Sequence, residues 1–585
     1  MHAKPFFLTV LASVASAGSL SANPRITSWF TENSGQYARI YETTAAETAR
    51  TTSTTWTRGQ GTQSSPTYAD VSEVSYSTNW VYIRTTGLAS HVMGPWYLDA
   101  AKTQNFPNFP ANTGSIYRIP LTPTIPTTKS LTGLGASGVM VNGVSIFDSR
   151  DAFSYVSASS TDATPVNGLT GDGVWNRDGY HNEGVTFDPG LAHQAGKNYH
   201  YHAQPIGLRY QLGDHVNYNA TTNRYTEKSG TPTKHSPLVG WLADGLPLYG
   251  PYGYSDPLVP SSGVRRMVSG FVLRNGQSGT TNLTTTGRTT LPAWAQRIQT
   301  VTFRNGPAVS TTYALGHYIE DFDYLGDRGQ TLGVQFDLNE QNARWCVTPE
   351  FPAGTWAYFT AINADGTPAY PYTSGRAYYG SPTGGSTTIS ETVTTHFKGG
   401  PNKTETAKSV QVSGNSATVQ WSAVEGGTYT VKSTSDLGTW TTLSTTAQPS
   451  GSTLTQTETG VGNKRFYQAQ RTAIAAFDTT GFNYTTGGGT GTGTNITAPG
   501  GTATRGTTVV VTVTLPTTPP LPPANVIPAS MTLGTITGTT ISRPAQGTAQ
   551  ATFVIPAGAA TGALSMSIVF SPGPTYTVAN AVTIQ

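Results

Sequence analysis

The sequence has little cysteine and little charge, and both shortages restrict the kinds of protein it encodes. Its 585 residues include one cysteine, Cys346, so no disulfide can form within the chain. Charged residues make up 11% of the chain, against about 25% in an average soluble protein, and 34 basic side chains nearly balance 31 acidic ones. Nucleic-acid-binding proteins normally carry a clustered basic face, which this sequence lacks. We therefore expect neither a disulfide framework nor a nucleic-acid partner.

Several signatures of familiar enzymes are missing as well. The chain has no Gly-x-Ser-x-Gly segment, which marks the nucleophile of α/β-hydrolases, and no phosphate-binding Walker loop. Beyond the N-terminal segment, no apolar run approaches the roughly 18 residues of a membrane-spanning helix. We therefore do not expect an α/β-hydrolase or a P-loop nucleotide hydrolase. We also do not expect a membrane-spanning helix.

The chain is instead rich in glycine (65), proline (38) and tyrosine (29), with abundant threonine. Glycine and proline favour turns, whereas threonine and aromatic residues favour strands. Asn142-Gly143 and Asp244-Gly245 each stand between apolar, strand-like runs, as in tight hairpins. Segment 291–299, LPAWAQRIQ, is the best candidate for a helix. The expected fold class is all-β with few short helices.

The N-terminal segment 1–22 has the three parts of a secretory signal peptide. Lys4 supplies a positive charge, an apolar run follows over 6–14, and small residues lead to Ala17 and to Ala22. We expect cleavage near Ala17 or Ala22 and a secreted, extracellular or cell-surface protein. The lack of disulfides in an exported protein of this size favours a bacterial host.

Composition divides the remaining chain into a large domain and two smaller modules. Residues 23–400 are expected to form the large β-rich domain. Over 401–475, short strand-like runs recur about every ten residues, as in a fibronectin III-like β-sandwich. Over 476–585, a Gly/Thr-rich linker precedes an expected immunoglobulin-like β-sandwich. Neither module contains a histidine, so metal or acid–base chemistry is expected in the large domain.

Histidines gather in that domain, around the segment KNYHYHAQP. Seven of the ten histidines lie between positions 181 and 317. Alternate side chains of a β-strand share a face, so His200 and His202 would lie on one face and Tyr199 and Tyr201 on the other. Two imidazoles about 6.5–7 Å apart along a strand converge readily on one ion, and neutral imidazole suits Zn, Cu, Fe or Ni. The alternative is a pair of structural histidines with the tyrosines in a core.

A metal site needs more ligands than this pair. His235 and His181 are the most plausible additional histidines, and the carboxylate of Glu183 would act as a ligand or orient one. Further carboxylate candidates are Asp244, Asp321 and Asp323. The last two belong to the acid-rich stretch HYIEDFDYLGDRG, residues 317–329, which offers oxygen ligands for Ca²⁺ or forms a solvated loop.

Six segments together carry a resemblance to a known family. They are GLASHVMGPWY, GVMVNGVSIFDSRD, WNRDGYHNEGVTFD, YHYH, HSPLVGWLADGLPLYG and DLNEQNARWCVTPEFPAGTWAYF. Over residues 75–385 the chain resembles the YHYH-domain family of exported bacterial proteins. The family's marked residues fall on Tyr199, His200, Tyr201, His202, His235, Asp244 and Gly245, and Glu183 and Asp188 match the upstream segment.

Two departures from the family pattern stand out. The stretch DPGLAHQAGKN before the tetrapeptide has His193 but lacks the cysteine that members often carry, which puts any role for sulfur in doubt. Asn342-Ala343-Arg344 replaces Asn-Gly-Arg, a change that affects a turn. The resemblance implies a clustered site but no particular reaction.

The sequence thus predicts an exported protein with a histidine-based site for a divalent transition metal, Cu or Zn. The predicted ligands are His200, His202 and His235, with His181 as a further candidate and Glu183 beside them. If the metal is catalytic, Tyr199, Tyr201 or Asp244 would transfer protons, and whether the protein is an enzyme stays open. The alternative is a non-catalytic cell-surface or matrix protein that binds extracellular polysaccharide through its aromatic side chains.

Overall fold

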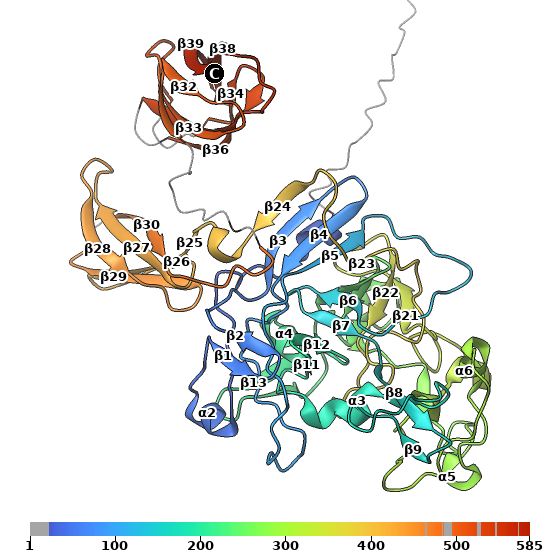
Figure 1. The fold of residues 1–585 in the computed structure, drawn as a ribbon. Helices are drawn as coiled ribbons and strands as arrows, with labels where there is room; N and C mark the ends of the chain where they lie inside the picture. The colour runs from blue at the N-terminus through green and yellow to red at the C-terminus, as the bar shows by residue number, and fades with distance from the viewer. Residues whose placement is uncertain are drawn as a thin grey trace, which may run out of the picture. The chain divides into compact units, whose positions relative to one another are not determined.

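The computed structural model describes residues 23–462, 465–482, 484, 494–522, 528–543, 547–570 and 573–585. The chain divides into two compact units, 1–487 and 488–585 (Figure 1). The expected signal peptide over 1–22 lies outside the described residues. Strands dominate both units, which confirms the expected all-β class.

The described helices are few and short. They are α1 (Pro24–Thr27), α2 (Thr44–Ala49), α3 (Gly179–Glu183), α4 (Ile206–Gln211), α5 (Leu283–Thr286) and α6 (Ala293–Ile298). The last confirms the helix expected over 291–299. Over the part of the chain that is described, no helix combines the length and apolar character needed to cross a membrane.

An eight-stranded mixed sheet forms the centre of the first unit. Its order is β11-β12-β7-β6-β15-β16-β22-β21. The strands are β6 (Ala136–Met140), β7 (Ser145–Phe147), β11 (His193–Ala195), β12 (Asn198–Tyr201), β15 (Leu238–Leu242), β16 (Pro247–Tyr249), β21 (Ala343–Cys346) and β22 (Thr355–Phe359). Gly143 and Gly245 have φ of +85° and +78° in the turns of the β6–β7 and β15–β16 hairpins, as their Asn-Gly and Asp-Gly signals predict.

A five-stranded antiparallel sheet packs against this centre, with the order β23-β5-β4-β3-β24. Its strands are β3 (Val71–Tyr76), β4 (Trp80–Thr85), β5 (Ser115–Pro120), β23 (Gly385–Ser386) and β24 (Thr394–Lys398). One hydrophobic core contains side chains of both sheets, among them Val74, Ile83, Val139 and Trp241. Burial of this apolar surface holds the two sheets together.

A second core, rich in aromatic rings, lies under the region of α5 and α6. It contains Trp175, Phe271, Trp294, Tyr318 and Tyr370. Smaller strand groups surround it: β8 (Arg150–Val156), β9 (Thr161–Asp162) and β10 (Asn176–Asp178), and the pair β19 (Phe271–Leu273) and β20 (Phe322–Tyr324). Two further pairs are β13 (Val216–Asn219) with β14 (Arg224–Glu227), and β17 (Tyr252–Tyr254) with β18 (Val264–Arg266).

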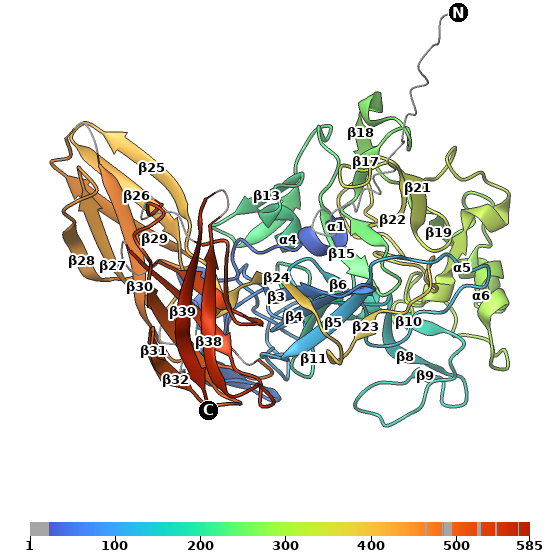
Figure 2. The ribbon, with the colours of Figure 1, turned by 90° about the horizontal axis from the view of Figure 1, so that it is seen from above.

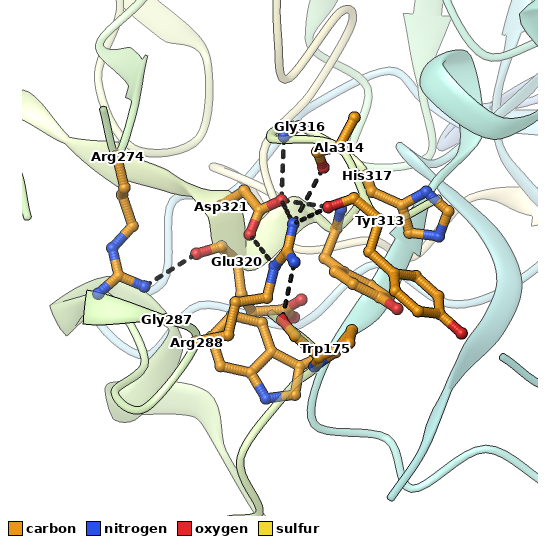
Figure 3. Close-up of polar contacts among 12 residues, drawn as sticks. Trp175, Arg274, Gly287, Arg288, Tyr313, Ala314, Gly316, His317, Glu320 and Asp321 are labelled. Atoms are coloured by element: carbon orange, nitrogen blue, oxygen red, sulfur yellow. Dashed lines mark hydrogen bonds and ion pairs between the residues drawn. The ribbon is translucent and has the colours of Figure 1, made fainter. Parts of the chain in front are cut away.

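The acid-rich stretch 317–329 folds largely into this region instead of forming a solvated loop. Figure 3 shows the Arg288 guanidinium in contact with the Asp321 carboxylate, and both N–O distances are 2.7 Å. Neither side chain is exposed. Glu320 is also buried and accepts hydrogen bonds from the backbone and side chain of Asn176, at 2.7 and 2.8 Å. These carboxylates are paired within the protein, because an unpaired buried charge is costly.

Residues 407–474 form a separate β-sandwich within the first unit (Figure 2). Its two sheets have the orders β25-β26-β29 and β28-β27-β30. The strands are β25 (Ala407–Ser413), β26 (Ser416–Ser422), β27 (Gly427–Thr434), β28 (Thr441–Ala447), β29 (Thr453–Thr459) and β30 (Phe466–Ile474). Trp421 and Tyr429 lie in its core. The fibronectin III-like assignment stays a prediction.

The second unit has two sheets, with the orders β31-β33-β37-β36 and β32-β39-β38-β34-β35. The strands are β31 (Thr494–Ala498), β32 (Gly501–Ala503), β33 (Thr508–Thr514), β34 (Ser530–Leu533), β35 (Ile536–Thr537), β36 (Thr539–Ser542), β37 (Thr548–Val554), β38 (Gly562–Val569) and β39 (Thr575–Ile584). Val511, Phe553 and Ile568 belong to a core of its own. The immunoglobulin-like assignment also stays a prediction.

Candidate metal centre

The YHYH segment is the second strand of a tight hairpin. β11 and β12 pair antiparallel, with His193 opposite His200 and Ala195 opposite Asn198. Gly196 has φ of +60° in the two-residue turn, a conformation that glycine adopts without strain. On its other side β12 runs parallel to β7, where His200 lies opposite Ser145. This register brings a third histidine, His193, beside the His-x-His pair.

Backbone carbonyl groups orient the rings of His200 and His202. The Nδ1 atom of His200 lies 3.0 Å from the Asn198 carbonyl oxygen, and that of His202 lies 2.7 Å from the Asp148 carbonyl oxygen. A carbonyl only accepts, so each Nδ1 carries a hydrogen, and the neutral ring keeps its lone pair on Nε2. The two Nε2 atoms are 3.0 Å apart. Two lone pairs at this distance repel each other unless a proton or a metal ion lies between them.

His193 has the same tautomer for a related reason. The Thr186 hydroxyl donates to the Glu183 carbonyl oxygen at 2.7 Å, so it accepts from the His193 Nδ1–H, also at 2.7 Å. The Nε2 lone pair of His193 is therefore free as well. One ligand nitrogen from each of His193, His200 and His202 lies within 4.8 Å of the others, and all three residues are buried.

Glu183 brings a carboxylate to the same point. It ends α3, whose first turn is capped by the Asp178 carboxylate accepting from the His181 N–H at 2.8 Å. The Glu183 Oε2 atom lies 3.2 Å from His202 Nε2 and 3.6 Å from His193 Nε2. This oxygen is buried and has no well-aligned hydrogen bond to any described residue. This oxygen therefore has a lone pair available for a metal ion, as do the Nε2 atoms of the three histidines.

The spacing of these atoms suits a small metal ion. Four ligands about 2.0–2.1 Å from a tetrahedral ion lie about 3.3 Å from one another. The separations of 3.0, 3.2 and 3.6 Å given above bracket that value. Three neutral imidazoles and a carboxylate are typical ligands of Zn²⁺ and of other transition metals. The described structure is therefore compatible with a metal site at His193, His200, His202 and Glu183.

Aromatic side chains enclose the three imidazoles. Phe147 stacks on His200, with ring centres 3.9 Å apart and an 18° angle between the planes. The ring of Phe187 lies 4.8 Å from that of His193. These contacts restrict rotation of the imidazoles and lower the local polarity, which strengthens electrostatic interactions inside the site.

The environment sets different protonation states for the three histidines. Burial, together with the neighbouring imidazoles, lowers the pKa of His193 and His200 well below the usual value. Burial also acts to lower the pKa of His202, but the Glu183 carboxylate 3.2 Å away outweighs it and raises that pKa. Without a metal, a proton on His202 would thus relieve the contact with His200.

The site opens into a cavity of about 150 Å³. Besides the four donor residues, Phe106, Phe147, Asp148, Arg150 and Asp151 line it. The Asp148 carboxylate accepts from Arg150 Nη2 at 2.7 Å and from the Thr132 hydroxyl at 3.1 Å, which fixes the backbone that holds His202. Burial raises the pKa of Asp151 to about 7, and Glu183 adds to the shift while Arg177 opposes it.

Tyr199 and Tyr201 lie on the opposite face of β12, as the alternation predicts. Both are fully buried in the main core. The Tyr199 hydroxyl donates to Asp188 at 2.8 Å, and that of Tyr201 lies 3.0 Å from His91 Nε2. Burial raises the pKa of both tyrosines well above the usual value. This placement supports a structural role for the two tyrosines rather than proton transfer at the histidine cavity.

His235 lies in another cavity, of about 570 Å³, with His215 and Glu350. Its Nδ1 atom is 2.7 Å from the Ser236 carbonyl oxygen, and its ring packs against Tyr249 at 5.0 Å. Burial lowers the pKa of His235 to about 4. The cluster of His193, His200 and His202 does not include it.

His181 and Asp244 also lie apart from the three histidines. His181 faces a larger cleft, where its ring is 5.6 Å from that of His317. The Asp244 carboxylate accepts from the Tyr358 hydroxyl at 2.6 Å and from the N–H groups of Gly380 and Leu246 at 2.9 and 3.0 Å. These bonds fix the turn that contains Gly245, so the structure favours a structural role for Asp244.

His193 is a donor that the predicted ligand set did not include. A signal for it exists, because a two-residue turn at Gly196-Lys197 pairs positions 193 and 200. Gly-Lys is a weaker hairpin signal than Asn-Gly, so the sequence alone does not predict that His193 pairs with His200.

Comparison with known families supports the resemblance in this part of the chain. Residues 116–372 match the model of a family described as YHYH protein. The matched segment contains Glu183 and all three clustered histidines. A search of curated proteins finds no match. The match supports assignment of residues 116–372 to the YHYH family and leaves the reaction open.

Proposed function

We propose that this region binds one divalent transition-metal ion through the Nε2 atoms of His193, His200 and His202, with the Glu183 carboxylate as fourth donor. The observation that carries the proposal is the common tautomer of the three histidines. Each Nδ1–H is used by an oxygen acceptor, so three Nε2 lone pairs converge beside a free carboxylate oxygen. Such outer hydrogen bonds are typical of metal-ligating histidines.

Zn²⁺ and Cu²⁺ are the ions that we propose for this set. Imidazole-rich sites favour both over Mg²⁺ or Ca²⁺, which prefer oxygen ligands. His193 replaces His235 in the ligand set expected from the sequence, because His235 lies in a different cavity.

We further propose that the site is catalytic, because a cavity of about 150 Å³ adjoins the ligands. A metal here would supply Lewis-acid chemistry toward a water or a small oxygen-containing substrate. Asp151 would exchange a proton with the bound molecule, since burial raises its pKa to about 7 in the metal-free protein against the opposing charge of Arg177, 2.9 Å away. The aromatic side chains that enclose the imidazoles would allow only small groups to reach the metal. A purely structural metal is the alternative outcome.

Loading the metal-free protein with one equivalent of Cu²⁺ tests the ligand set. Electron paramagnetic resonance is expected to show hyperfine splitting from three nitrogen donors. His193→Ala should remove one donor, whereas His235→Ala should leave the spectrum unchanged. A spectrum that responds to His235→Ala but not to His193→Ala would refute the proposal. Circular dichroism would confirm that both variants fold.

A further inference from the structure

A second, larger cleft lies next to the histidine cavity and shares α3 with it. Its volume is about 650 Å³, within the range of small-molecule sites. Tyr180 and His181 of α3 line the cleft, whereas Glu183 at the end of the same helix lines the histidine cavity. The other walls come from β19, from the loop 275–278, from Leu315, Gly316 and Phe322, and from the segment 363–372.

Among the described residues that line this cleft there is no Asp, Glu, Lys or Arg. It combines aromatic rings with neutral hydrogen-bonding groups. The rings are those of Tyr180, Phe271, Phe322, Tyr370 and Tyr372, and the polar side chains include Asn275, Gln277, Ser278 and Asn363. His181 adds an imidazole to these hydrogen-bonding groups, and its ring lies 5.6 Å from that of His317.

The walls are held in place by buried polar contacts. The Arg288 guanidinium, bound to Asp321, also donates to the carbonyl oxygens of Tyr313 and Ala314, at 3.2 and 2.9 Å (Figure 3). The Asp321 carboxylate accepts from the Gly316 N–H at 2.9 Å. These bonds fix the loop whose residues Leu315 and Gly316 form one wall. The cleft is therefore preformed, which reduces the entropy lost on binding.

The floor of the cleft is fixed in a similar way. The Tyr372 hydroxyl donates to the buried Asp178 carboxylate, with both oxygens at 2.8 Å. Tyr370 stacks on Phe322, with ring centres 4.5 Å apart and a 14° angle between the planes. Tyr180 packs at 5.4 Å from Tyr372 and is half-buried, so part of its ring stays available to a ligand.

We propose that this cleft binds an uncharged carbohydrate, a short neutral oligosaccharide. A sugar ring presents C–H groups on its faces and hydroxyl groups around its edge. The C–H faces pack against aromatic rings, and the hydroxyl groups form hydrogen bonds with amides and hydroxyls. One ligand therefore satisfies both parts of the lining. A phosphate, carboxylate or ammonium ligand would find no opposite charge in the cleft. A purely apolar ligand would bury the amides unpaired.

Sugar binding in this cleft would not depend on the metal centre. The residues that line the cleft would bind the sugar, and none of the three clustered histidines is among them. A folded His193→Ala/His200→Ala variant is therefore expected to bind sugar as the wild type does. Failure of sugar binding and failure of metal binding are thus distinguishable.

Ligand-observed NMR and calorimetry on the wild-type protein test the proposal. The neutral probes are maltotriose, cellotriose, xylotriose and tri-N-acetylchitotriose, at concentrations up to about 10 mM. The charged probes are trigalacturonate and the glucosamine trimer. We expect saturable binding of at least one neutral trimer and at least tenfold weaker binding of both charged trimers. Absence of binding by all four neutral trimers, or equal binding of a charged one, would overturn the proposal.

Two substitutions at one position locate the binding. Tyr180→Ala removes the stacking ring and is expected to weaken binding at least tenfold. Tyr180→Phe keeps the ring and should change affinity less than threefold, because no described residue forms a hydrogen bond with this hydroxyl in the structure. Trp345→Ala serves as the control, since Trp345 is an exposed aromatic residue, 46% accessible, that does not line the cleft. Unchanged binding by Tyr180→Ala, or loss of binding by Trp345→Ala, would contradict the placement.

Discussion

Each clustered imidazole depends on one oxygen acceptor at its far nitrogen. For His200 and His202 this acceptor is a backbone carbonyl, which no substitution removes. For His193 it is the hydroxyl of Thr186, which substitution can remove. Thr186 is therefore the position at which control of the tautomer can be tested while all proposed ligands remain.

Thr186→Val is expected to weaken metal binding about tenfold, because His193 then loses the acceptor that fixes its tautomer. The lost hydrogen bond should also cost about 1–2 kcal/mol of unfolding free energy. Thr86→Val is the matched control, since the buried Thr86 hydroxyl donates to the Tyr68 carbonyl oxygen at 2.9 Å, away from the site. Chelator competition and urea unfolding separate the two effects. Equal metal affinity in both variants would refute the role given to Thr186.

Metal binding is also expected to release about one proton at pH 6. His193 and His200 have lowered pKa values, so they are already neutral, whereas His202 has a raised pKa and keeps its proton beside Glu183. As the pH rises through the pKa of His202, the number of released protons should fall toward zero and the apparent affinity should level off. Calorimetry in buffers of different ionisation enthalpy measures this number. Release of about three protons at pH 6 would contradict these protonation states.

At the scale of elements, the hairpin β11–β12 decides which histidines meet. The alternation in YHYH predicted correctly that the two tyrosines and the two histidines occupy opposite faces, because strand geometry has a period of two. The partner of the pair was not predictable in the same way. His193 meets His200 through the turn at Gly196, whereas His235 is brought elsewhere by the long-range pairing of β15 with β6. Such pairings depend on tertiary packing, which a single sequence does not reveal.

The turn itself is open to test. Gly196→Ala forces a side chain into φ of +60° and is expected to cost about 1 kcal/mol of unfolding free energy in the metal-free protein. Because the strain falls on the hairpin that pairs His193 with His200, metal affinity should drop as well. Gly230→Ala is the control, since Gly230 has φ of +87° and an added Cβ would meet no atom within 4 Å. If both variants bind metal as the wild type does, the hairpin does not set the site.

At the scale of the whole molecule, the site and its supporting residues all belong to the first unit. The second unit has a core of its own, and its sequence contains no histidine. Composition predicted the all-β class, and the spacing of short strand-like runs predicted a sandwich over 401–475, where the structure has two three-stranded sheets. Neither predicted that this sandwich is anchored to the large domain, where the Tyr68 hydroxyl donates to the Glu425 carbonyl oxygen at 3.0 Å and Val424 shares a small core with Tyr37.

Removal of residues 488–585 should therefore leave metal binding intact. The shortened protein is expected to bind the same number of ions with an affinity within twofold of the full chain. Addition of the preferred metal should raise its unfolding temperature as it does in the full chain, because the ion binds only the folded first unit. Loss of binding on truncation, measured by equilibrium dialysis, would show that the second unit contributes to the site.

The most direct measurement is the metal content of the full chain after chelator treatment and reloading with Zn²⁺ or Cu²⁺. Elemental mass spectrometry should find about one equivalent in the wild type and in His215→Ala/His235→Ala, and close to none in His193→Ala/His200→Ala. Circular dichroism and thermal unfolding of the metal-free proteins would confirm that both double variants fold. A wild type that holds no metal after reloading, or a His193→Ala/His200→Ala variant that keeps the full equivalent, would contradict the account.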